Sequence, residues 1–351
     1  METIIRKYDS EAPDASVMEE AGKILRAGGL VAFPTETVYG LGGDALNPQA
    51  SEKIYAAKGR PSDNPLIVHI ADLQALQVLT SRIPDRARAL ADRFWPGPLT
   101  MIMPKSDVVP RQTTGGLDTV AIRMPSDPTA YELIRSSGVY IAAPSANTSG
   151  RPSPTLARHV AEDLSGRIDM IIDGGRCDIG LESTIVDLTG DIPVILRPGY
   201  ITKEMLEEAV GRVDIDRAVT ASRPDPNLRP KAPGMKYRHY APRGSLTVVQ
   251  GSREAVAAKI NSLVKEKQAQ GKRCAVIASE ENMRLYQAER IMNIGSRRHE
   301  ESIAANLYDI LREMDEEDID FIYSESFTGE GLGFAIMNRL LKAAGHQIIQ
   351  L

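Results

Sequence analysis

The sequence predicts an α/β protein in two parts, the first with a mixed β-sheet and the second with parallel strands. The chain has 351 residues, 42% hydrophobic and 25% charged, a globular composition whose length predicts about two domains. Short apolar segments bounded by Gly, Pro or Ser alternate with amphipathic segments, which predicts strands and helices in succession. A Pro-rich segment separates the two parts.

The first part, residues 1–210, contains six short apolar segments that predict strands, because turn residues bound each of them. They cover residues 30–33, 66–70, 99–103, 120–124, 139–143 and 185–188. Helical patterns lie between several of them, near 49–58, 84–93, 127–137 and 154–163, but their spacing is irregular. We therefore expect a mixed sheet rather than a regular doubly wound one.

Residues 17–26 predict the most regular helix of this part. Its apolar face is formed by Val17, Ala21, Ile24 and Leu25. Ser16, followed three residues later by Glu19, predicts a capping box at the start of the helix. Gly28 and Gly29 predict its end.

Residues 211–245 predict a linker, because prolines among polar residues prevent a sustained helical or strand period. These prolines are Pro224, Pro226, Pro230, Pro233 and Pro242. The linker also contains the string Lys236-Tyr237-Arg238-His239-Tyr240. Such a string can contact phosphates and stack on a base, and a plain solvated connector, the alternative, needs neither the tyrosines nor the histidine.

The second part, residues 246–351, alternates more regularly. Strands are predicted at 246–249, 274–278 and 319–323, and helices at 253–268, 302–314 and 332–343. This alternation is typical of a Rossmann-like parallel sheet. The segment lacks G-x-G-x-x-G, and Gly329, Gly331 and Gly333 precede a late helix, where a helix-entry turn is favoured over a dinucleotide site.

Charge and cysteine content limit the partners and the compartment. The 42 Lys and Arg and 47 Asp and Glu residues give a net charge of −5, so RNA would have to bind through a local basic patch. Cys177 and Cys274 form neither a Cys-x-x-Cys zinc motif nor a disulfide framework, which fits a reducing cytoplasm. Without an apolar signal segment or a run of about 18 apolar residues, we expect a cytoplasmic protein with no membrane span.

Hydroxyl-rich turns follow or precede several predicted strands. They are Pro-Thr-Glu-Thr at 34–37, Pro-Ser-Ala-Asn-Thr-Ser-Gly at 144–150 and Glu-Ser-Thr at 182–184. Ligands of open α/β sheets bind at strand ends, where free N–H groups and hydroxyls suit phosphate and carboxylate oxygens. We expect the three turns to converge on an anion pocket; for each turn taken alone, the alternative is an ordinary turn.

Four cations are candidates to serve that pocket: Lys58 and Arg60 after a predicted helix, and Arg123 and Arg197 after apolar strands. Lys58 and Arg60 have the alternative of complementing a helix C-terminus, worth up to about 1 kcal/mol. Arg123 and Arg197 need an anionic partner where buried, and an internal Asp or Glu would serve as well as a ligand.

Several kinds of catalytic site lack their motif. The five histidines show no His-x-His or His-Glu-x-x-His spacing, so a histidine-bound metal is not expected. Walker A and Gly-x-Ser-x-Gly motifs are absent from the sequence as well. Without an enzyme nucleophile, catalysis would rest on positioning and electrostatics.

Six motifs occur together in this chain. They are PTETVYGL at 34–41, KGRP at 58–61, PSAN at 144–147, ESTIVD at 182–187, RPG at 197–199 and KYRHYAP at 236–242. In this order they resemble the long, two-domain threonylcarbamoyl-AMP synthases over essentially the whole chain. The resemblance implies a YrdC-like domain over 1–210, a linker over 211–245 and a Rossmann-like domain over 246–351.

The resemblance also implies a reaction, in which L-threonine, bicarbonate or CO2, and ATP give threonylcarbamoyl-AMP and pyrophosphate. Mg²⁺ would accompany ATP, without dedicated protein ligands. Downstream transferase proteins would then modify an adenosine beside the anticodon of tRNA. Because water destroys the mixed-anhydride product, residues 236–240 are expected to act as a lid over the site.

Residue by residue, the resemblance implies a threonine side and an ATP side of one pocket. The threonine side comprises Thr35, Arg123, Ala143, Ser145 and Ser183, with Arg123 holding the carboxylate. The ATP side comprises Lys58, Arg60, Ser62, Thr119, Asn147, Ser153, Arg197, Tyr237 and His239. His69 is expected to be a packed strand residue rather than a catalyst.

Two other functions compete with the synthase. One is a noncatalytic module for double-stranded RNA or tRNA, since YrdC-like domains are associated with a concave basic surface; the net charge of −5 argues against it. The other is a carbamoyl-phosphate enzyme with a YrdC-like domain, but such chains carry zinc-finger or acylphosphatase modules that this sequence lacks. The synthase is therefore favoured.

Overall fold

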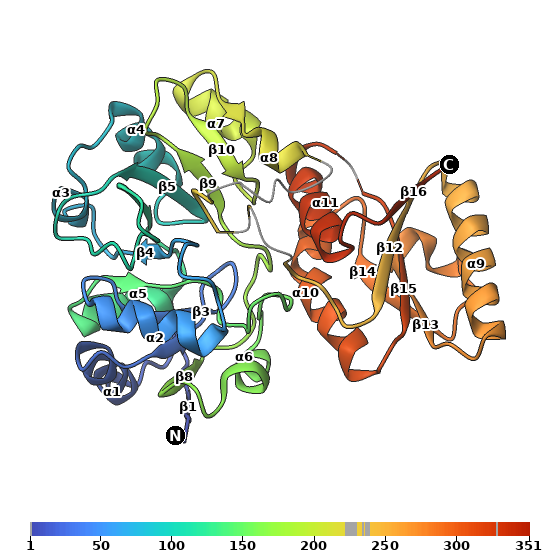
Figure 1. The fold of residues 1–351 in the computed structure, drawn as a ribbon, viewed down its shortest axis with the longest axis horizontal. Coiled ribbons are helices and arrows are strands. Elements are labelled where there is room, and N and C mark those ends of the chain that lie inside the picture. Colours follow the sequence, from blue (N-terminus) through green and yellow to red (C-terminus); the bar gives the residue numbers. More distant parts are fainter. Residues whose placement is uncertain (1, 222–229, 234, 236–238, 328) are drawn as a thin grey trace. The chain divides into compact units, whose positions relative to one another are not determined.

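A computed structural model describes residues 2–221, 230–233, 235, 239–327 and 329–351 (Figure 1). The chain divides into two units. The first comprises Met1–Ser149 and Ser153–Lys236, and the second comprises Gly150–Pro152 and Tyr237–Leu351. The short segment 150–152 is thus grouped with residues that begin only at Tyr237, which the sequence pattern does not predict.

Within the described residues, the first unit forms one 11-stranded mixed sheet with the order β1-β8-β2-β3-β7-β4-β6-β5-β9-β10-β11. The strands are β1 (Ile4–Lys7), β2 (Val31–Phe33), β3 (Gly40–Asp44), β4 (Ile67–His69), β5 (Leu99–Pro104), β6 (Thr119–Arg123), β7 (Ile141–Ala142), β8 (Met170–Asp173), β9 (Thr184–Asp187), β10 (Val194–Arg197) and β11 (Asp214–Ile215). Strand β6 pairs in parallel with β4 and antiparallel with β5. The predicted mixed sheet is confirmed.

Helices of the first unit bury this sheet on both faces. They are α1 (Ala15–Arg26), α2 (Pro48–Lys58), α3 (Ala75–Leu79), α4 (Asp85–Phe94), α5 (Pro128–Ser137), α6 (Ala157–Leu164), α7 (Lys203–Val210) and α8 (Arg217–Thr220). Val31 and Phe33 of β2 join an apolar cluster with Leu25 of α1 and Leu133 of α5. Ala32 between them belongs to the other cluster, as expected from side chains that alternate along a strand.

In the second unit, the described residues form a five-stranded sheet with the order β14-β13-β15-β12-β16, and every pair is parallel. The elements are β12 (Ser245–Gln250), α9 (Arg253–Ala269), β13 (Cys274–Ser279), η1 (Glu280–Leu285), β14 (Arg290–Gly295), α10 (Glu300–Glu316), β15 (Phe321–Glu325), α11 (Gly331–Ala343) and β16 (Ile348–Gln350). Figure 1 shows α9 on one face of the sheet and α10 and α11 on the other. The predicted Rossmann-like arrangement is confirmed.

The start of α1 differs from the prediction. Asp14 rather than Ser16 is the N-cap, because its Oδ1 accepts a hydrogen bond from the Ser16 backbone N–H at 2.9 Å. Glu19 pairs instead with Lys23, at 2.7 Å, so the predicted capping box is wrong. A carboxylate is a charge-assisted acceptor, which favours Asp14 over a serine hydroxyl at this position.

Among the elements that the sequence did not predict, β3 differs from β11 and α8 in the reason. Strand β3 contains three glycines, which are rare in strands, yet a Cβ on Gly42 would lie only 2.7 Å from Ile141 Cγ2, so the sheet requires glycine there. Strand β11 and helix α8 lie inside the predicted linker 211–245 and are too short to show a period. The predicted linker therefore contains regular elements as far as Thr220.

The described residues were also considered for helices that could span a membrane. No helix there is both long enough and apolar enough to cross a bilayer.

Candidate active site

The three hydroxyl-rich turns meet in the first unit, as predicted. Gly40, at the start of the strand β3 that follows the first turn, forms an isolated bridge with Ser145 in the turn after β7. The third turn is joined through Thr100, which lies opposite Arg123 in the β5–β6 register and whose hydroxyl is 2.8 Å from Ser183 Oγ. Polar side chains from three separate segments therefore surround the end of β6.

Arg123 ends β6 and is only 4% exposed. Its Nη2 lies 2.8 Å from Glu36 Oε2, and its Nη1 donates to Thr37 Oγ1 at 2.8 Å. The internal salt bridge that the sequence left open is thus present. Burial acts to raise the pKa of the Glu36 carboxyl, but the Arg123 guanidinium holds that pKa below its usual range. Among the described residues, Arg123 Nε has no hydrogen-bond partner, which leaves a buried donor for a ligand.

Thr35 organises the turn that carries Glu36 and Thr37. Its hydroxyl accepts hydrogen bonds from the backbone N–H groups of Thr37 and Val38, at 3.2 and 3.3 Å, and donates to Val38 O at 2.7 Å. These bonds fix the turn locally and direct Glu36 and Thr37 toward Arg123.

Strands β4 and β7 bring His69 and Ala143 to the same region. His69 is the register partner of Arg123, and its ring lies edge-on to Phe33 with centroids 6.2 Å apart. Burial and the Arg123 charge lower the His69 pKa to about 3, so the imidazole is neutral, as expected of a packed strand residue. Ala143 is buried, and its N–H donates to Ile67 O at 2.8 Å.

Arg197 ends β10 and is buried against the third turn. Its Nε donates to Ser183 O at 3.0 Å, and its Nη2 donates to Ser183 Oγ at 3.1 Å. Ser183 also contacts the hydroxyl of Thr100, the residue that lies opposite Arg123 in the β5–β6 register. The structure therefore brings together Arg123, Ser183 and Arg197, which lie far apart in the sequence.

Lys58 is the last residue of α2, which ends at Gly59 with φ of 61°. The Lys58 Nζ donates to Ser145 O at 2.5 Å and to the backbone oxygen of Asn147. Ser145 Oγ in turn donates to Asn147 Oδ1 at 2.5 Å. Lys58 is thus directed to the Pro-Ser-Ala-Asn turn, while it also stands in the last turn of α2, where a cation complements the helix end.

Three further ATP-side candidates have separate local settings. Arg60 Nη2 donates to the backbone oxygen of Asn64 at 3.2 Å, and Ser62 is exposed in the same turn. Thr119 begins β6, so it lies about 13 Å along the strand from Arg123.

Ser153 donates to Glu182 Oε1 at 2.6 Å, and both side chains are buried. Sequence reasoning selected Ser153 but not Glu182, Glu36 or Thr37, although all three stand in or beside the selected turns. Thr100 carries no sequence signal, because it lies inside an apolar strand and only the register places it opposite Arg123.

The linker candidates are only partly described. Tyr237, with Lys236 and Arg238, lies outside the described residues. His239 belongs to the second unit, where its ring centroid is 5.5 Å from that of Tyr240. The lid role of 236–240 stays a prediction.

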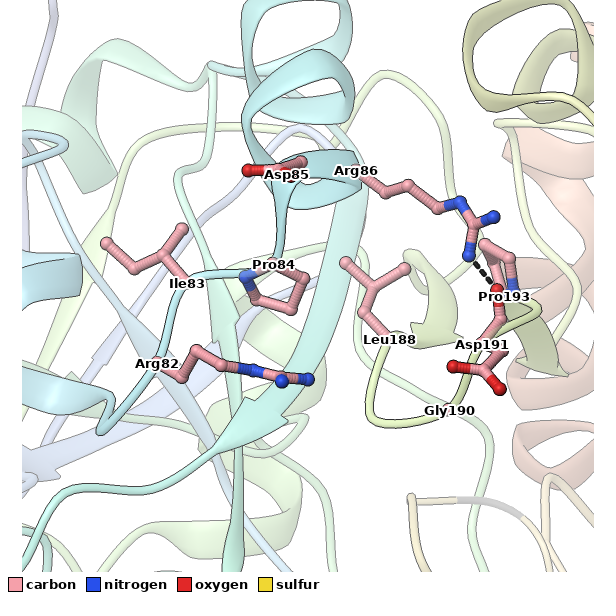
Figure 2. Close-up of a pocket in the computed structure, with 9 residues that line it drawn as sticks. All are labelled: Arg82, Ile83, Pro84, Asp85, Arg86, Leu188, Gly190, Asp191 and Pro193. Carbon is pink, nitrogen blue, oxygen red and sulfur yellow. Dashed lines mark hydrogen bonds between the residues drawn. The ribbon is translucent and has the colours of Figure 1, made fainter.

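A cavity of about 520 Å³ in the first unit lies elsewhere (Figure 2). It is lined by Arg82, Ile83, Pro84, Asp85, Arg86, Leu188, Gly190, Asp191 and Pro193. Figure 2 shows the Arg86 guanidinium reaching across to the backbone oxygen of Asp191. None of the predicted site residues lines this cavity, so it is separate from the three converging turns.

The second unit has a cavity of about 410 Å³ near the carboxyl ends of its strands. Glu325, at the end of β15, accepts hydrogen bonds from Ser279 N, Asn282 Nδ2 and Arg297 Nη2, the last at 2.7 Å. Arg297 also stacks over Phe327, 5.1 Å from the ring centroid. The cavity wall is therefore braced by a buried carboxylate with a full set of donors.

The glycine-rich segment before α11 is a helix entry, as favoured from the sequence. Gly331 is the first residue of α11, and the Gly333 N–H donates to Glu300 Oε2 at 2.9 Å. A carboxylate of the protein thus occupies a backbone donor that a dinucleotide phosphate would use.

Two family models match successive parts of the chain, and they meet near residue 200, before the division between the two units at Lys236. Residues 23–199 match the Sua5/YciO/YrdC family, described as telomere recombination, and residues 201–345 match the threonylcarbamoyl-AMP synthase C-terminal domain. The fold and site are thus those of a YrdC-like enzyme with an added C-terminal domain.

Relatives that align with nearly the whole chain identify the family within this class of enzymes. The chain is 53% identical over 332 residues to the threonylcarbamoyl-AMP synthase of Bacillus subtilis, and 52% identical over 330 residues to that of Pyrococcus abyssi, each covering 94% of both chains. The solved structure of P. abyssi Sua5 complexed with L-threonine matches with a TM-score of 0.94 at 49% identity, over 99% of this chain and 100% of that one. The chain belongs to the threonylcarbamoyl-AMP synthase family.

Proposed function

We propose that this enzyme condenses L-threonine, bicarbonate or CO2, and ATP into L-threonylcarbamoyl-AMP, with release of pyrophosphate. The observation that carries the proposal is the buried Arg123, whose Nη2 pairs with Glu36 while its Nε has no partner among the described residues. A guanidinium holds a carboxylate through two parallel N–H groups, so the remaining donors suit the threonine carboxylate. The relative complexed with L-threonine supports this substrate.

The proposed chemistry needs no enzyme nucleophile. The threonine amine attacks the CO2 carbon, forms the C–N bond and loses a proton, which gives a carbamate. A carbamate oxygen then attacks the α-phosphorus of ATP in line, while the bond to the bridging oxygen breaks and pyrophosphate leaves. The chain contributes alignment of the reactants and cations that offset the developing charge.

The two substrates would meet at the Pro-Ser-Ala-Asn turn. Ser145 is assigned to the threonine side and Asn147 to the ATP side, and Lys58 Nζ donates to the backbone oxygens of both. Lys58 is therefore suited to stabilise the carbamate oxygen and the α-phosphate together. Arg197, held through Ser183, would supply a second buried cation for the phosphates.

Magnesium would enter with ATP. The residues assigned to the ATP side include three cations, and the buried acid beside them, Glu182, accepts the Ser153 hydroxyl hydrogen bond. This donor set suits phosphate oxygens that already carry Mg²⁺, which would neutralise part of their charge. We further propose that the product passes to transferase proteins that modify tRNA in the cytoplasm.

The test measures pyrophosphate release by the purified full chain with ATP and magnesium, omitting L-threonine or bicarbonate in turn. Mass spectrometry identifies the nucleotide product. Release that requires both substrates, with the threonylcarbamate adenylate detected, is the expected result. Release that needs neither substrate, or RNA binding without turnover, would overturn the synthase in favour of a binding module.

A further inference from the structure

The second unit contains a three-residue segment from the middle of the first unit's sequence. Gly150–Pro152 group with Tyr237–Leu351, whereas their chain neighbours Ser149 and Ser153 belong to the first unit. The first carbonyl oxygen of the segment accepts a hydrogen bond from Ala241 N at 2.9 Å. Because the segment is so short, whatever holds it also restrains the residues on both sides.

Two buried charged residues of α10 contact this segment. Arg312 is 1% exposed, and its Nη2 donates to Pro152 O at 2.7 Å. Asp315 is 4% exposed, and its Oδ2 lies 3.8 Å from Arg151 Nη2. Burying charged side chains is costly, and apolar residues would fill the same space without that cost. Their presence indicates that the contacts themselves are required.

The same helix holds the chain that follows the linker. Tyr308 stacks on Tyr240 with ring centroids 5.1 Å apart, and Asp315 Oδ1 accepts a hydrogen bond from Arg243 N at 2.6 Å. We call Tyr308, Arg312 and Asp315 the α10 seat. The seat thus joins residues 150–152 to residues 240–243.

Both ends of the held segment lead into the candidate ATP side. Ser149 N donates to Lys58 O at 2.9 Å, and Asn147, two residues earlier, contacts the Lys58 ammonium. On the other side, Ser153 donates to Glu182 at 2.6 Å. A shift of the three intervening residues would therefore displace Asn147 and Ser153 together.

We propose that Arg312 and Asp315 are positioning residues for ATP, which act by fixing 150–152 and thereby the placement of Asn147 and Ser153. This inference rests on the proposed function for the assignment of those two residues to the ATP side. It gives the C-terminal domain a defined task in a reaction whose substrates are bound by the first unit.

The test compares Arg312→Met with a matched variant, Arg297→Met, in the full chain. Arg297 is a charged residue of the same unit whose described contacts do not include 150–152. Steady-state pyrophosphate release gives KM for ATP and for threonine, and thermal unfolding gives the stability of each variant. We expect Arg312→Met to raise KM for ATP about tenfold with KM for threonine within about twofold, and Arg297→Met to change neither.

Arg312→Lys supplies the rescue. A lysine retains a donor for Pro152 O, so we expect it to recover most of the ATP affinity. An unchanged KM for ATP in Arg312→Met, or equal rises in both KM values, would overturn the positioning role. An equal loss in Arg297→Met would also overturn it, because the effect would then follow stability.

If Arg312→Met does not fold, Asp315→Asn tests the same positioning role. The amide keeps an acceptor for Arg243 N and removes the charge that faces Arg151. We expect a rise in KM for ATP of about threefold, and no rise would refute the proposal. Wild-type chain that forms no threonylcarbamoyl-AMP would instead refute the proposed function itself, so the two failures are distinguishable.

Discussion

Each unit buries a glutamate–arginine pair beside the end of a strand, and the two pairs differ in what they leave unsatisfied. In the first unit, Arg123 is the more enclosed partner, with its side chain 4% exposed, and its Nε has no partner in the part of the chain that the structure describes. In the second unit, Glu325 is enclosed at 3% while Arg297 is 35% exposed. Glu325 receives donors from three residues.

This difference indicates which of the two pairs has capacity left for a ligand. A buried carboxylate with all its donors supplied has no capacity left for a ligand, so the Arg297–Glu325 pair braces the wall of its cavity. A buried guanidinium with an unused N–H retains capacity, because the cost of that donor is recovered when a ligand carboxylate binds. The same two residue types therefore serve different purposes.

The largest expected effect comes from removing Arg123. Arg123→Ala deletes the proposed carboxylate clamp and leaves Glu36 buried without its cation, and we expect pyrophosphate release to fall by about 10²- to 10³-fold. Threonine titrations measure the loss. Arg111→Ala, which removes an exposed arginine paired with Asp118 in the same unit, is the control and should retain full activity. Normal threonine dependence in Arg123→Ala would contradict the clamp.

Removing Glu325 should lower stability and leave the kinetics unchanged. Glu325→Ala leaves Arg297 and two other donors without their acceptor, so we expect the free energy of unfolding to fall by about 3 kcal/mol. Urea unfolding measures this loss. The folded fraction should keep its kcat and both KM values within about twofold. If its threonine KM rose as in Arg123→Ala, the distinction between the pairs would not hold.

A third effect concerns pH near the first pair. Burial, with the Glu36 charge adding to it, raises the pKa of Asp127 to about 6, although the carboxyl accepts a hydrogen bond from Ala130 N. Because the folded pKa exceeds the unfolded one, the stability contribution is present below about pH 4 and is lost as the pH rises through about 6. Asp127→Asn should flatten this slope, a change of about 2 kcal/mol, in unfolding measured from pH 4 to 7. An unaltered slope in the variant would show that Asp127 is not responsible.

The smallest effect concerns the acid beside the second pair. Burial acts to raise the pKa of Glu281, but hydrogen bonds from the Ser296 hydroxyl and the Arg297 N–H lower it to about 2. Its contribution is therefore present above the unfolded value near 4.5 and lost as the pH falls through 2, opposite in sign to Asp127. Glu281 is exposed, so Glu281→Gln should cost less than about 1 kcal/mol at pH 7 in urea unfolding. A larger loss of unfolding free energy would show that Glu281 stabilises the cavity wall together with the Arg297–Glu325 pair.

The apolar strands and regular helices could be predicted because their signals are local. Helix α2 follows from its period and its capping residues Asn47 and Gly59, and β5 follows from an uninterrupted apolar run. The glycine-rich β3 could not be predicted, since Gly42 is required by Ile141, a residue about one hundred positions away.

The candidate site divides in the same way. Arg123 and Lys58 could be selected because a cation next to an apolar strand or a helix end is conspicuous in the sequence. Their partners could not, because the pairing of Arg123 with Glu36 and of Lys58 with the Ser145 carbonyl depends on which turns meet. Thr100 could not be selected from the sequence, because only the β5–β6 register places it opposite Arg123.

The sequence by itself determined the fold class, the order of the motifs and the residue types available for chemistry, since periodicity and turn composition are properties of neighbouring residues. Only the tertiary structure decided that Arg123 Nε has no hydrogen-bond partner among the described residues, and that Gly150–Pro152 is held by Arg312 and Asp315. The physical reason is that burial and pairing depend on segments far apart in the chain. A charged side chain acquires its partner and its dielectric environment only when those segments pack together.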